Sequence, residues 1–444
     1  MLLNTKISNK IHGAMFHIAK KLIFLNRDQL YRNSYYIMVN SVNSGVTGLI
    51  FWIIVARLLD VQSVGLAIVI ISASSSVVNI SLLGVGTSII RYLSNEKDKI
   101  NFINISLTIV GVSCIIISLI FVMGISIWAK KLEFILWSPL YIIIFTFFTT
   151  VSALSSTFIN IYVAQRDTKY FFLQSAISDI IRLFFPFILI NLLGAIGVFS
   201  SLGISNFISF IISVLYFSKK VVPSYKLYPE LRLELIKKIE SFSMGNYFVN
   251  LISNVPFLVI PFLILHFLTP EDNAYFYMAF SIASLLFMIP ISLSTSLFAE
   301  GSFREETFIP NLRKVVIHAY GLVLLAITLI IFFGNRILLL FGPAYSVNSS
   351  QLLTMLAISC IFLTLNSFYT TYLKVKLKII ELIMLNVFLS ISILTLSYFL
   401  IQEPFLNING VGIAYIFAQG LMSLYVVLKL RVIPLHKIGI KYHK

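Results

Sequence analysis

Two side chains of opposite charge stand in the middle of a long apolar stretch. Asp179 and Arg182 lie roughly 12 and 16 Å into the segment 171–193, at the 1.5 Å rise per residue of a helix. A charge in mid-membrane costs ~2.5–3.5 kcal/mol or more, so such residues usually face a bundle interior or a watery cavity. Because they are three positions apart, the two can pair on one helix face. Their chemistry suits a site for an anionic substrate or coupling ion, or an ion pair that locks helix packing.

Two stripes of amides provide further candidates for a binding site. Asn246, Asn250 and Asn254 are spaced four apart on one face of a helix, and Asn40 and Asn43 form a similar stripe. If the stripes oppose each other across the molecule, they line one polar cleft. The alternative is that the amides join neighbouring helices, each contact contributing only ~0.6 kcal/mol. The sequence leaves both interpretations open.

Motifs for common enzyme chemistry are absent from the sequence. It contains no P-loop, no HExxH, no GxSxG and no Cys/His cluster, so ATP hydrolysis by this chain is not expected. Cys114 and Cys360 both lie in apolar runs and are expected to be buried residues, not a disulfide or metal site. We therefore predict no metal and no cofactor.

The elements that position these residues are predicted to be membrane-spanning helices. Hydrophobic residues make up 59% of the 444 residues and charged residues 11%, whereas a soluble domain carries about 25% charge. A run of about 20 apolar residues spans the hydrocarbon layer as a helix, which satisfies its own backbone hydrogen bonds. We predict an all-α integral membrane protein with twelve spans. They are 33–58, 64–89, 101–128, 135–161, 171–193, 196–217, 241–267, 275–298, 315–334, 351–373, 379–401 and 411–428.

The basic residues predict the orientation of the chain. With the N-terminus inside, 28 of the 33 Lys and Arg residues fall in inside loops and tails. Only Lys130, Lys131 and Arg336 fall in outside loops. Such a bias indicates an even number of spans with both termini in the cytoplasm, and we expect a cell-membrane location. It also accounts for the net charge of +16 without nucleic acid. No cleavable signal peptide is apparent in the first 32 residues.

The chain is predicted to hold two six-helix lobes. A shift of 209 positions places Ser72 and Ser75 on Ser281 and Ser284. Six spans per half give both halves one orientation, so a pseudo-twofold axis is expected along the membrane normal. The predicted parts are a basic N-terminal segment 1–32, an N-lobe 33–217, a linker 218–240, a C-lobe 241–428 and a basic tail 429–444.

The linker has a helical pattern of its own. Leu231, Leu235 and Ile239 recur at helical spacing. We predict an amphipathic helix that lies on the inner leaflet and couples the lobes. The alternative is a solvated linker with a short helix.

The segment from Gly48 to Leu93 resembles the opening of the polysaccharide and O-antigen flippases. These belong to the exporter superfamily that also holds the MATE drug antiporters and the lipid II flippases. The resemblance covers nearly the whole chain in span count and loop lengths, although Asp60 stands where such proteins often have proline. The motifs that carry it, in order, are Ala56-Arg57-Leu58, Val64-Gly65, Leu83-Gly84, Arg91, Leu268-Thr269-Pro270-Glu271, Leu297-Phe298-Ala299-Glu300, Leu340-Phe341-Gly342 through Tyr345, and Gly410-Val411-Gly412.

This resemblance implies a substrate and a mechanism. Two lobes alternate between inward- and outward-open forms, and an oligosaccharide on a polyprenyl diphosphate moves from the cytoplasmic to the outer leaflet. Arginine suits a diphosphate through its forked donors, so Arg57 joins Arg182 among the candidate substrate contacts. Membrane lipids, H⁺ or Na⁺ as coupling ion, and functionally linked glycosyltransferases or polymerases are the expected partners.

Three alternatives are considered. A MATE-like antiporter for organic cations favours an acidic, aromatic cavity, whereas the span interiors here hold one acid, Asp179, beside an arginine. A lipid II-type flippase is left open. A membrane glycan polymerase or oligosaccharyltransferase typically has a large external loop, and the longest one here, about 335–350, is too short. We therefore predict transport, not catalysis.

Overall fold

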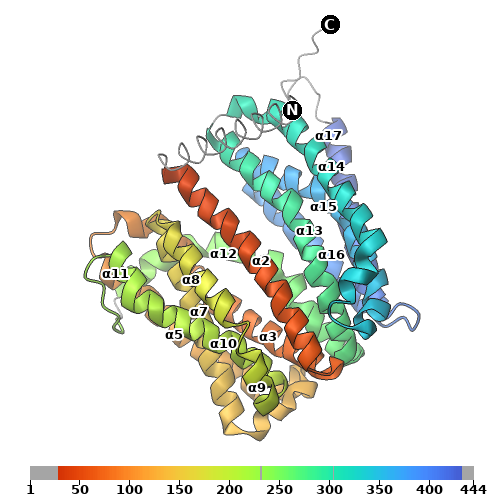
Figure 1. The fold of residues 1–444 in the computed structure, drawn as a ribbon. Coiled ribbons are helices and arrows are strands. Elements are labelled where there is room, and N and C mark those ends of the chain that lie inside the picture. The colour runs from red at the N-terminus through yellow and green to blue at the C-terminus, as the bar shows by residue number, and fades with distance from the viewer. Residues whose placement is uncertain (1–28, 231–232, 304, 433–444) are drawn as a thin grey trace, which may run out of the picture.

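The structure is a computed structural model and describes residues 29–230, 233–303 and 305–432. These residues form helices joined by short turns, without strands (Figure 1). The earlier helices are α2 (Gln29–Leu58), α3 (Val61–Ser81), α4 (Val85–Tyr92), α5 (Lys99–Met123), α6 (Ile125–Trp128), α7 (Pro139–Ala164), α8 (Thr168–Ile181), α9 (Pro186–Leu193), α10 (Ala195–Ile212) and α11 (Ser218–Val221). The later ones are α12 (Leu233–Phe267), α13 (Pro270–Phe303), α14 (Glu305–Leu338), α15 (Pro343–Val375), α16 (Ile379–Ile401) and α17 (Asn409–Val432). The 3₁₀ turns η1 (Leu93–Asn95) and η2 (Lys130–Trp137) and the π-helical turn η3 (Ser213–Phe217) complete the elements.

Ten of the described helices are long and apolar enough to cross a membrane, which confirms the predicted class. An eleventh crossing is formed if α8 and α9 act together, although they are bent by 56° at their junction. Pro186 begins α9, and a proline has no N–H with which to continue the preceding helix. Leu251–Phe267 of α12 is a shorter apolar helix. The bent pair and the shorter helix fall on two predicted spans, and the count of twelve stays a prediction.

The helices gather in two bundles. We call α2–α11 the first bundle and α12–α17 the second bundle, and α2 crosses the middle of Figure 1 between them. The bundles meet mainly where α3 packs against α13 and where α12 packs against α3 and α4. The bundles also repeat in their boundaries. The helix ends Leu58 and Phe267, and the helix starts Val61 and Pro270, are each 209 positions apart. The symmetry axis and the lobe boundaries stay predictions.

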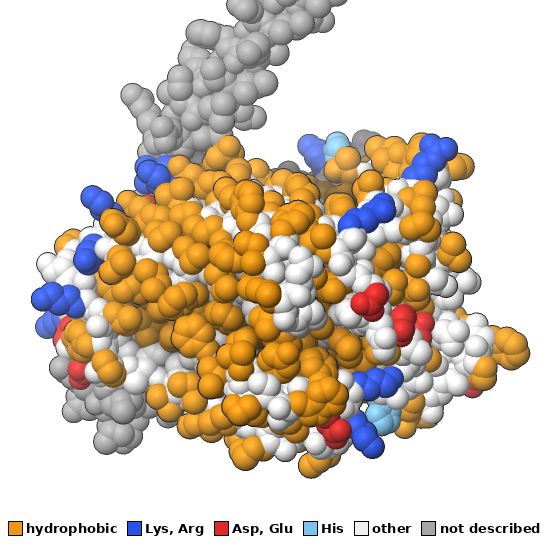
Figure 2. Space-filling view, turned by 60° about the horizontal axis from the view of Figure 1, so that its bottom comes forward, with side chains coloured by type: hydrophobic (Ala, Val, Ile, Leu, Met, Phe, Trp, Pro, Cys, Tyr) orange, Lys and Arg blue, Asp and Glu red, His pale blue; other side chains and the backbone are white. Residues whose placement is uncertain are grey.

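The outside of the molecule is hydrophobic in a manner that suits lipid contact. Figure 2 shows a broad hydrophobic surface with the charged side chains mostly toward its margins. Helix α14 illustrates the pattern, since Leu325, Leu329 and Phe332 are all exposed on it. Large apolar areas of this kind are not left in water by soluble monomers, so these side chains are expected to face acyl chains.

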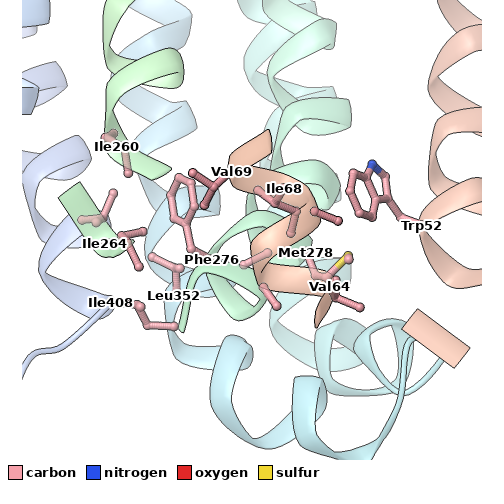
Figure 3. Close-up of a cluster of buried hydrophobic side chains, with 14 of the residues drawn as sticks. Trp52, Val64, Ile68, Val69, Ile260, Ile264, Phe276, Met278, Leu352 and Ile408 are labelled. Atoms are coloured by element: carbon pink, nitrogen blue, oxygen red, sulfur yellow. The ribbon is translucent and has the colours of Figure 1, made fainter. Parts of the chain in front are cut away.

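The two bundles share one hydrophobic core near one end of the molecule (Figure 3). Val64 and Ile68 of α3 pack there with Ile264 of α12, Phe276 of α13 and Leu352 of α15, all of them buried. This end carries the turns 58–61, 267–270 and 338–343. We call it the outer end, following the orientation that the basic residues predict. Its shared core means that the bundles are closed against each other there.

Asp60, which departs from the proline usual in similar proteins, begins helix α3. Its carboxylate accepts a hydrogen bond from the backbone N–H of Ser63 at 2.9 Å, which satisfies one of the free donors of the first turn. Partial burial raises the pKa of Asp60, but the hydrogen bonds from Ser63 outweigh it and hold the pKa below its usual value. The aspartate therefore acts as the side-chain cap of α3.

The first part of the predicted linker is fixed to the first bundle. The Tyr225 hydroxyl donates to the side-chain oxygen of Asn104 on α5 at 3.0 Å, and the amide of Asn104 donates to the Lys226 carbonyl at 2.9 Å. Helix α12 then begins at Leu233, inside the predicted linker. Leu231 lies outside the described residues, as do the side chains of 233–240. The helix on the inner leaflet stays a prediction.

Candidate functional site

Asp179 and Arg182 form an ion pair between helices α8 and α2. The Oδ1 atom of Asp179 lies 2.8 Å from Nη2 of Arg182. The Oδ2 atom accepts hydrogen bonds from Nδ2 of Asn43 at 2.8 Å and from Oγ of Ser44 at 2.7 Å. Both carboxylate oxygens are therefore occupied by donors. The pairing expected from the spacing of three is present, and α2 supplies its surroundings.

The Arg182 side chain reaches across α2 toward the second bundle. Its Nη2 atom donates to Oγ1 of Thr47 at 2.9 Å, and its guanidinium lies 6.0 Å from the centre of the Phe51 ring. Its Nε atom is buried and has no hydrogen-bond partner among the described residues. A buried donor without a partner is rare in native structures, so an additional acceptor is expected here.

The break between α8 and α9 explains how a charge is tolerated at this depth. Arg182 is the residue that caps the C-terminal end of α8, where the helix dipole favours a cation. Pro186 prevents the helix from continuing unchanged. The sequence predicts 171–193 as one span and does not include this break. Pro186 is the residue that could have indicated it.

Of the two amide stripes, the structure describes the side chains of Asn40, Asn43 and Asn254. Asn43 on α2 is turned toward α8 and holds Asp179. Asn40, on the same helix, is buried, and its Oδ1 atom has no hydrogen-bond partner among the described residues. In α12, Asn254 is exposed, while the side chains of Asn246 and Asn250 are not described. The α2 stripe thus belongs to the interior of the first bundle, and substrate contact by the α12 stripe stays a prediction.

Arg57 lies far from this pair, and its proposed contact with substrate stays a prediction. It is exposed, thirteen residues beyond Ser44 and so about 20 Å away along α2. Its Nε donates to the Leu340 carbonyl at 2.9 Å and its Nη2 to the Leu339 carbonyl at 2.7 Å. These carbonyls occupy its donors, and they belong to the second bundle. The structure therefore assigns Arg57 to a contact between bundles and not to the Asp179–Arg182 site.

A second cation makes the same kind of contact. Nζ of Lys131 donates to the carbonyl of Leu268 at 2.6 Å, joining the first bundle to the turn before α13. We call the two contacts made by Arg57 and Lys131 the outer latch. The sequence placed Lys131 in an outside loop, and only the structure shows that its partner is a backbone carbonyl.

Gly65 allows the bundles to approach at the outer end. A Cβ atom built on Gly65 would lie 1.7 Å from the carbonyl oxygen of Pro270, at the start of α13. No side chain fits there without moving the backbone. Two motifs singled out in the sequence, Val64-Gly65 and Thr269-Pro270, therefore form one contact. Their order along the chain was evident, but nothing in it indicated that they touch.

We predict that Arg57→Ala weakens closure of the outer end. The substitution removes two hydrogen bonds between the bundles, each worth about 1 kcal/mol. Spin labels at Ile127 and Val347, exposed at 84% and 77% on different bundles, report the separation. We expect a longer or broader distance distribution in the variant.

Arg336→Ala is the matched control for that measurement. Arg336 is exposed at the end of α14 and its guanidinium lies over Phe333 of its own helix, 5.6 Å from the ring centre. Its removal is expected to leave the distances unchanged. Identical distributions in wild type and Arg57→Ala would contradict the latch.

Together, these features define a polytopic α-helical membrane protein of two packed bundles, with a charged pair inside one of them. The chain belongs to the family described as "Polysaccharide biosynthesis protein", whose sequence profile matches residues 30–298, more than half of the chain. This confirms the resemblance seen in the sequence. No curated protein sequence matches the chain significantly.

Solved structures share the fold across nearly the whole chain. A lipid II flippase, MurJ, in an inward closed conformation has a TM-score of 0.72 at 15% identity, covering 90% of this chain and 88% of its own. An inward-facing multidrug resistance MATE family transporter of the MOP superfamily has a TM-score of 0.67 at 14% identity, and the match covers 89% of this chain and 94% of that transporter. A MOP superfamily transporter from Pyrococcus furiosus has a TM-score of 0.63 at 15% identity, and the match covers 93% of this chain and 95% of that transporter. The fold is therefore that of MOP superfamily transporters.

Metal chemistry has no candidate residues in the described part of the chain. Within residues 29–230, 233–303 and 305–432, no group of three His, Cys, Asp or Glu side chains is placed to hold an ion. Cys114 and Cys360 are both free and buried, as the apolar runs around them predicted. The functional proposal rests on the Asp179–Arg182 pair.

Proposed function

We propose that the chain is a flippase, not an enzyme, and that it moves an oligosaccharide linked to polyprenyl diphosphate from the cytoplasmic to the outer leaflet. The family match over residues 30–298 carries this proposal. The likeness in fold to a lipid II flippase supports it, because that protein also handles a lipid-linked substrate by its name. H⁺ or Na⁺ is proposed as the coupling ion.

The chemistry of the charged pair supports an anionic substrate. Asn43 and Ser44 share the carboxylate of Asp179 with Arg182. About 19% of the Arg182 side chain is exposed, and its buried Nε–H has no hydrogen-bond partner among the described residues. A phosphate oxygen is a strong acceptor for such a donor. We infer that Arg182 contacts the diphosphate and that Asp179 positions it.

The same contacts disfavour an antiporter for organic cations, although a multidrug transporter shares the fold. An organic cation needs an uncompensated carboxylate, and both oxygens of Asp179 already accept from Arg182, Asn43 or Ser44. Breaking that arrangement would leave Arg182 buried without its partner, which is costly. A lipid II-type substrate is an alternative that differs in its glycan.

The closed outer end supports a particular step of the transport cycle. The shared core, the outer latch and the Gly65–Pro270 contact all join the bundles there. We propose that this conformation loads substrate from the cytoplasmic side, and that separation of these contacts releases it outside. Alternating access requires such a change between two packed arrangements.

We predict that the linker faces the cytoplasm and that the start of α15 faces outward. Single cysteines at Lys226 and Val347, both exposed, are treated with a membrane-impermeant maleimide. Intact cells should label only Val347→Cys, whereas opened cells should label both. Because the native cysteines are buried, background labelling should be low. Labelling of Lys226→Cys in intact cells would refute the orientation.

The proposed function is tested in cells that lack the gene. Loss of the flippase should make lipid-linked oligosaccharide accumulate in the cytoplasmic leaflet, where an impermeant glycosidase added to spheroplasts cannot reach it. Re-expression should restore cleavage. If cleavage is the same with and without the gene, while sensitivity to organic cations rises on deletion, the antiporter is the correct interpretation.

A further inference from the structure

A second polar feature lies in the first bundle, outside the charged pair. It is a pocket of about 210 Å³ between α3, α7 and α10. Hydroxyls and amides line it, from Ser75 and Asn79 of α3, Ser152 of α7 and Asn206 of α10, together with the ring of Phe199. These four polar side chains are half-buried, so they retain surface that faces the pocket. No charged side chain lines it.

A short chain of hydrogen bonds joins the pocket to Ser178 of α8. Oγ of Ser178, the residue before Asp179, donates to Oδ1 of Asn206 at 2.9 Å. Nδ2 of Asn206 donates to Oγ of Ser152 at 3.1 Å. Ser178 and Arg182 are four positions apart and so share a face of α8, which places the pocket on the side of this helix that carries the proposed phosphate contact. The part of the substrate that would occupy this position is the group attached directly to the phosphate.

The chemistry of the lining selects an uncharged, polyhydroxylated ring. Serine hydroxyls and asparagine amides each donate and accept hydrogen bonds, as sugar hydroxyls do. Phe199 offers an apolar face against which ring C–H groups can pack. A buried phosphate or ammonium would find no opposite charge here, which is strongly unfavourable. The volume equals that of about seven liquid waters, enough for one ring and not for several.

We propose that this pocket binds the first sugar of the substrate, the ring attached to the diphosphate, and requires that ring to be uncharged. This rests on the proposed function, since it takes the substrate to be a lipid-linked glycan. The pocket thereby gives the first bundle a role in glycan specificity, while Arg182 recognises the diphosphate that all such lipids share.

The position of the pocket also connects binding to the movement of the bundles. Tyr247 of α12 donates from its hydroxyl to the carbonyl of Ile80 at 3.0 Å. Ile80 follows Asn79 directly in α3, so a helix of the second bundle rests beside one wall of the pocket. A sugar bound against Asn79 is thus placed where the two bundles touch.

Asn79→Leu tests the proposal with little disturbance of the fold. Nδ2 of Asn79 donates to the Ser75 carbonyl of its own helix at 2.8 Å, so the change removes pocket polarity while keeping a side chain that branches at Cγ. Asn191→Leu is the matched control. Its Nδ2 makes the same kind of bond, to the Phe187 carbonyl at 3.3 Å, on an exposed part of α9.

The measurement is the affinity of the purified full chain for two lipids, followed by native mass spectrometry. One probe is polyprenyl diphosphate carrying a single neutral hexose, and the other is polyprenyl diphosphate alone. Wild type and Asn191→Leu should prefer the sugar-bearing lipid by about tenfold, the value of one or two hydrogen bonds. Asn79→Leu should lose that preference and bind the sugarless lipid as wild type does.

The outcomes separate the pocket from the proposed function. An undiminished preference in Asn79→Leu, or equal binding of the two lipids by wild type, overturns the sugar site and leaves diphosphate binding intact. A pocket that holds only water gives the first of these results. Failure of wild type to bind either lipid overturns both the pocket and the flippase.

Discussion

Changing Arg182 to alanine is expected to abolish flipping. The variant removes the proposed diphosphate contact and leaves the buried Asp179 carboxylate without its cation, and breaking a buried ion pair costs about 3–5 kcal/mol. Transport should fall by at least about a hundredfold, since each 1.4 kcal/mol is a factor of ten. Arg182→Lys should restore only part of the rate, because lysine keeps the charge but loses the forked geometry.

The double variant Asp179→Ala with Arg182→Ala separates binding from packing. If the pair only locks helices, removing both members is far milder than removing one. If Arg182 binds substrate, the double variant is as inactive as Arg182→Ala. Initial transport rates are compared at equal membrane abundance. Full transport by the double variant would show that Arg182 has no role in recognising the substrate.

Changing Gly65 to leucine is expected to stop transport by a different route. The new side chain begins 1.7 Å from the Pro270 carbonyl oxygen, so α3 and α13 cannot keep their approach and the outer end cannot close. The protein should remain open outward, with transport reduced to background. The spin-label distance between Ile127 and Val347 should lengthen more than in Arg57→Ala, because backbone contact is lost and not only hydrogen bonds.

Gly321→Leu provides the control for this substitution. Gly321 also lies within a helix, but a Cβ atom there meets nothing within 4 Å. Its transport rate and label distances should match those of wild type. Closure and normal transport in Gly65→Leu would mean that the Gly65–Pro270 contact is not needed for the cycle.

The class of protein was predictable because it rests on composition and run length. Apolar stretches of sufficient length must become helices in lipid, and the helices follow the predicted spans closely. Some predicted spans are interrupted, among them 64–89 between α3 and α4 and 171–193 between α8 and α9. Pro186 marks the break between α8 and α9, but the sequence does not mark the contacts that Asn43 and Thr47 of α2 make with the charged pair. A contact 135 or more residues away leaves no local trace in the sequence.

The candidate site was predictable in part, for a related reason. Asp179 and Arg182 pair through local spacing, which a sequence reveals. The sequence does not show which face of α2 meets which helix, because that depends on tertiary packing. It therefore left open whether Asn43 lines a cleft or contacts α8. The contact of Arg57 with the second bundle could not be predicted, because its partners are the backbone carbonyls of Leu339 and Leu340 and a backbone carbonyl carries no sequence signal.

The most direct test of the flippase is translocation in proteoliposomes that contain only this chain. A fluorescent polyprenyl-diphosphate oligosaccharide is placed in both leaflets, and an impermeant reductant added outside bleaches the outer pool. With wild type, continued flipping should carry bleaching beyond the outer-leaflet half, whereas Arg182→Ala vesicles should stop there, as empty ones do. The assay is run with an H⁺ gradient, with a Na⁺ gradient and without any gradient. If wild-type bleaching stops at the outer-leaflet half under all three conditions, the flippase account is contradicted.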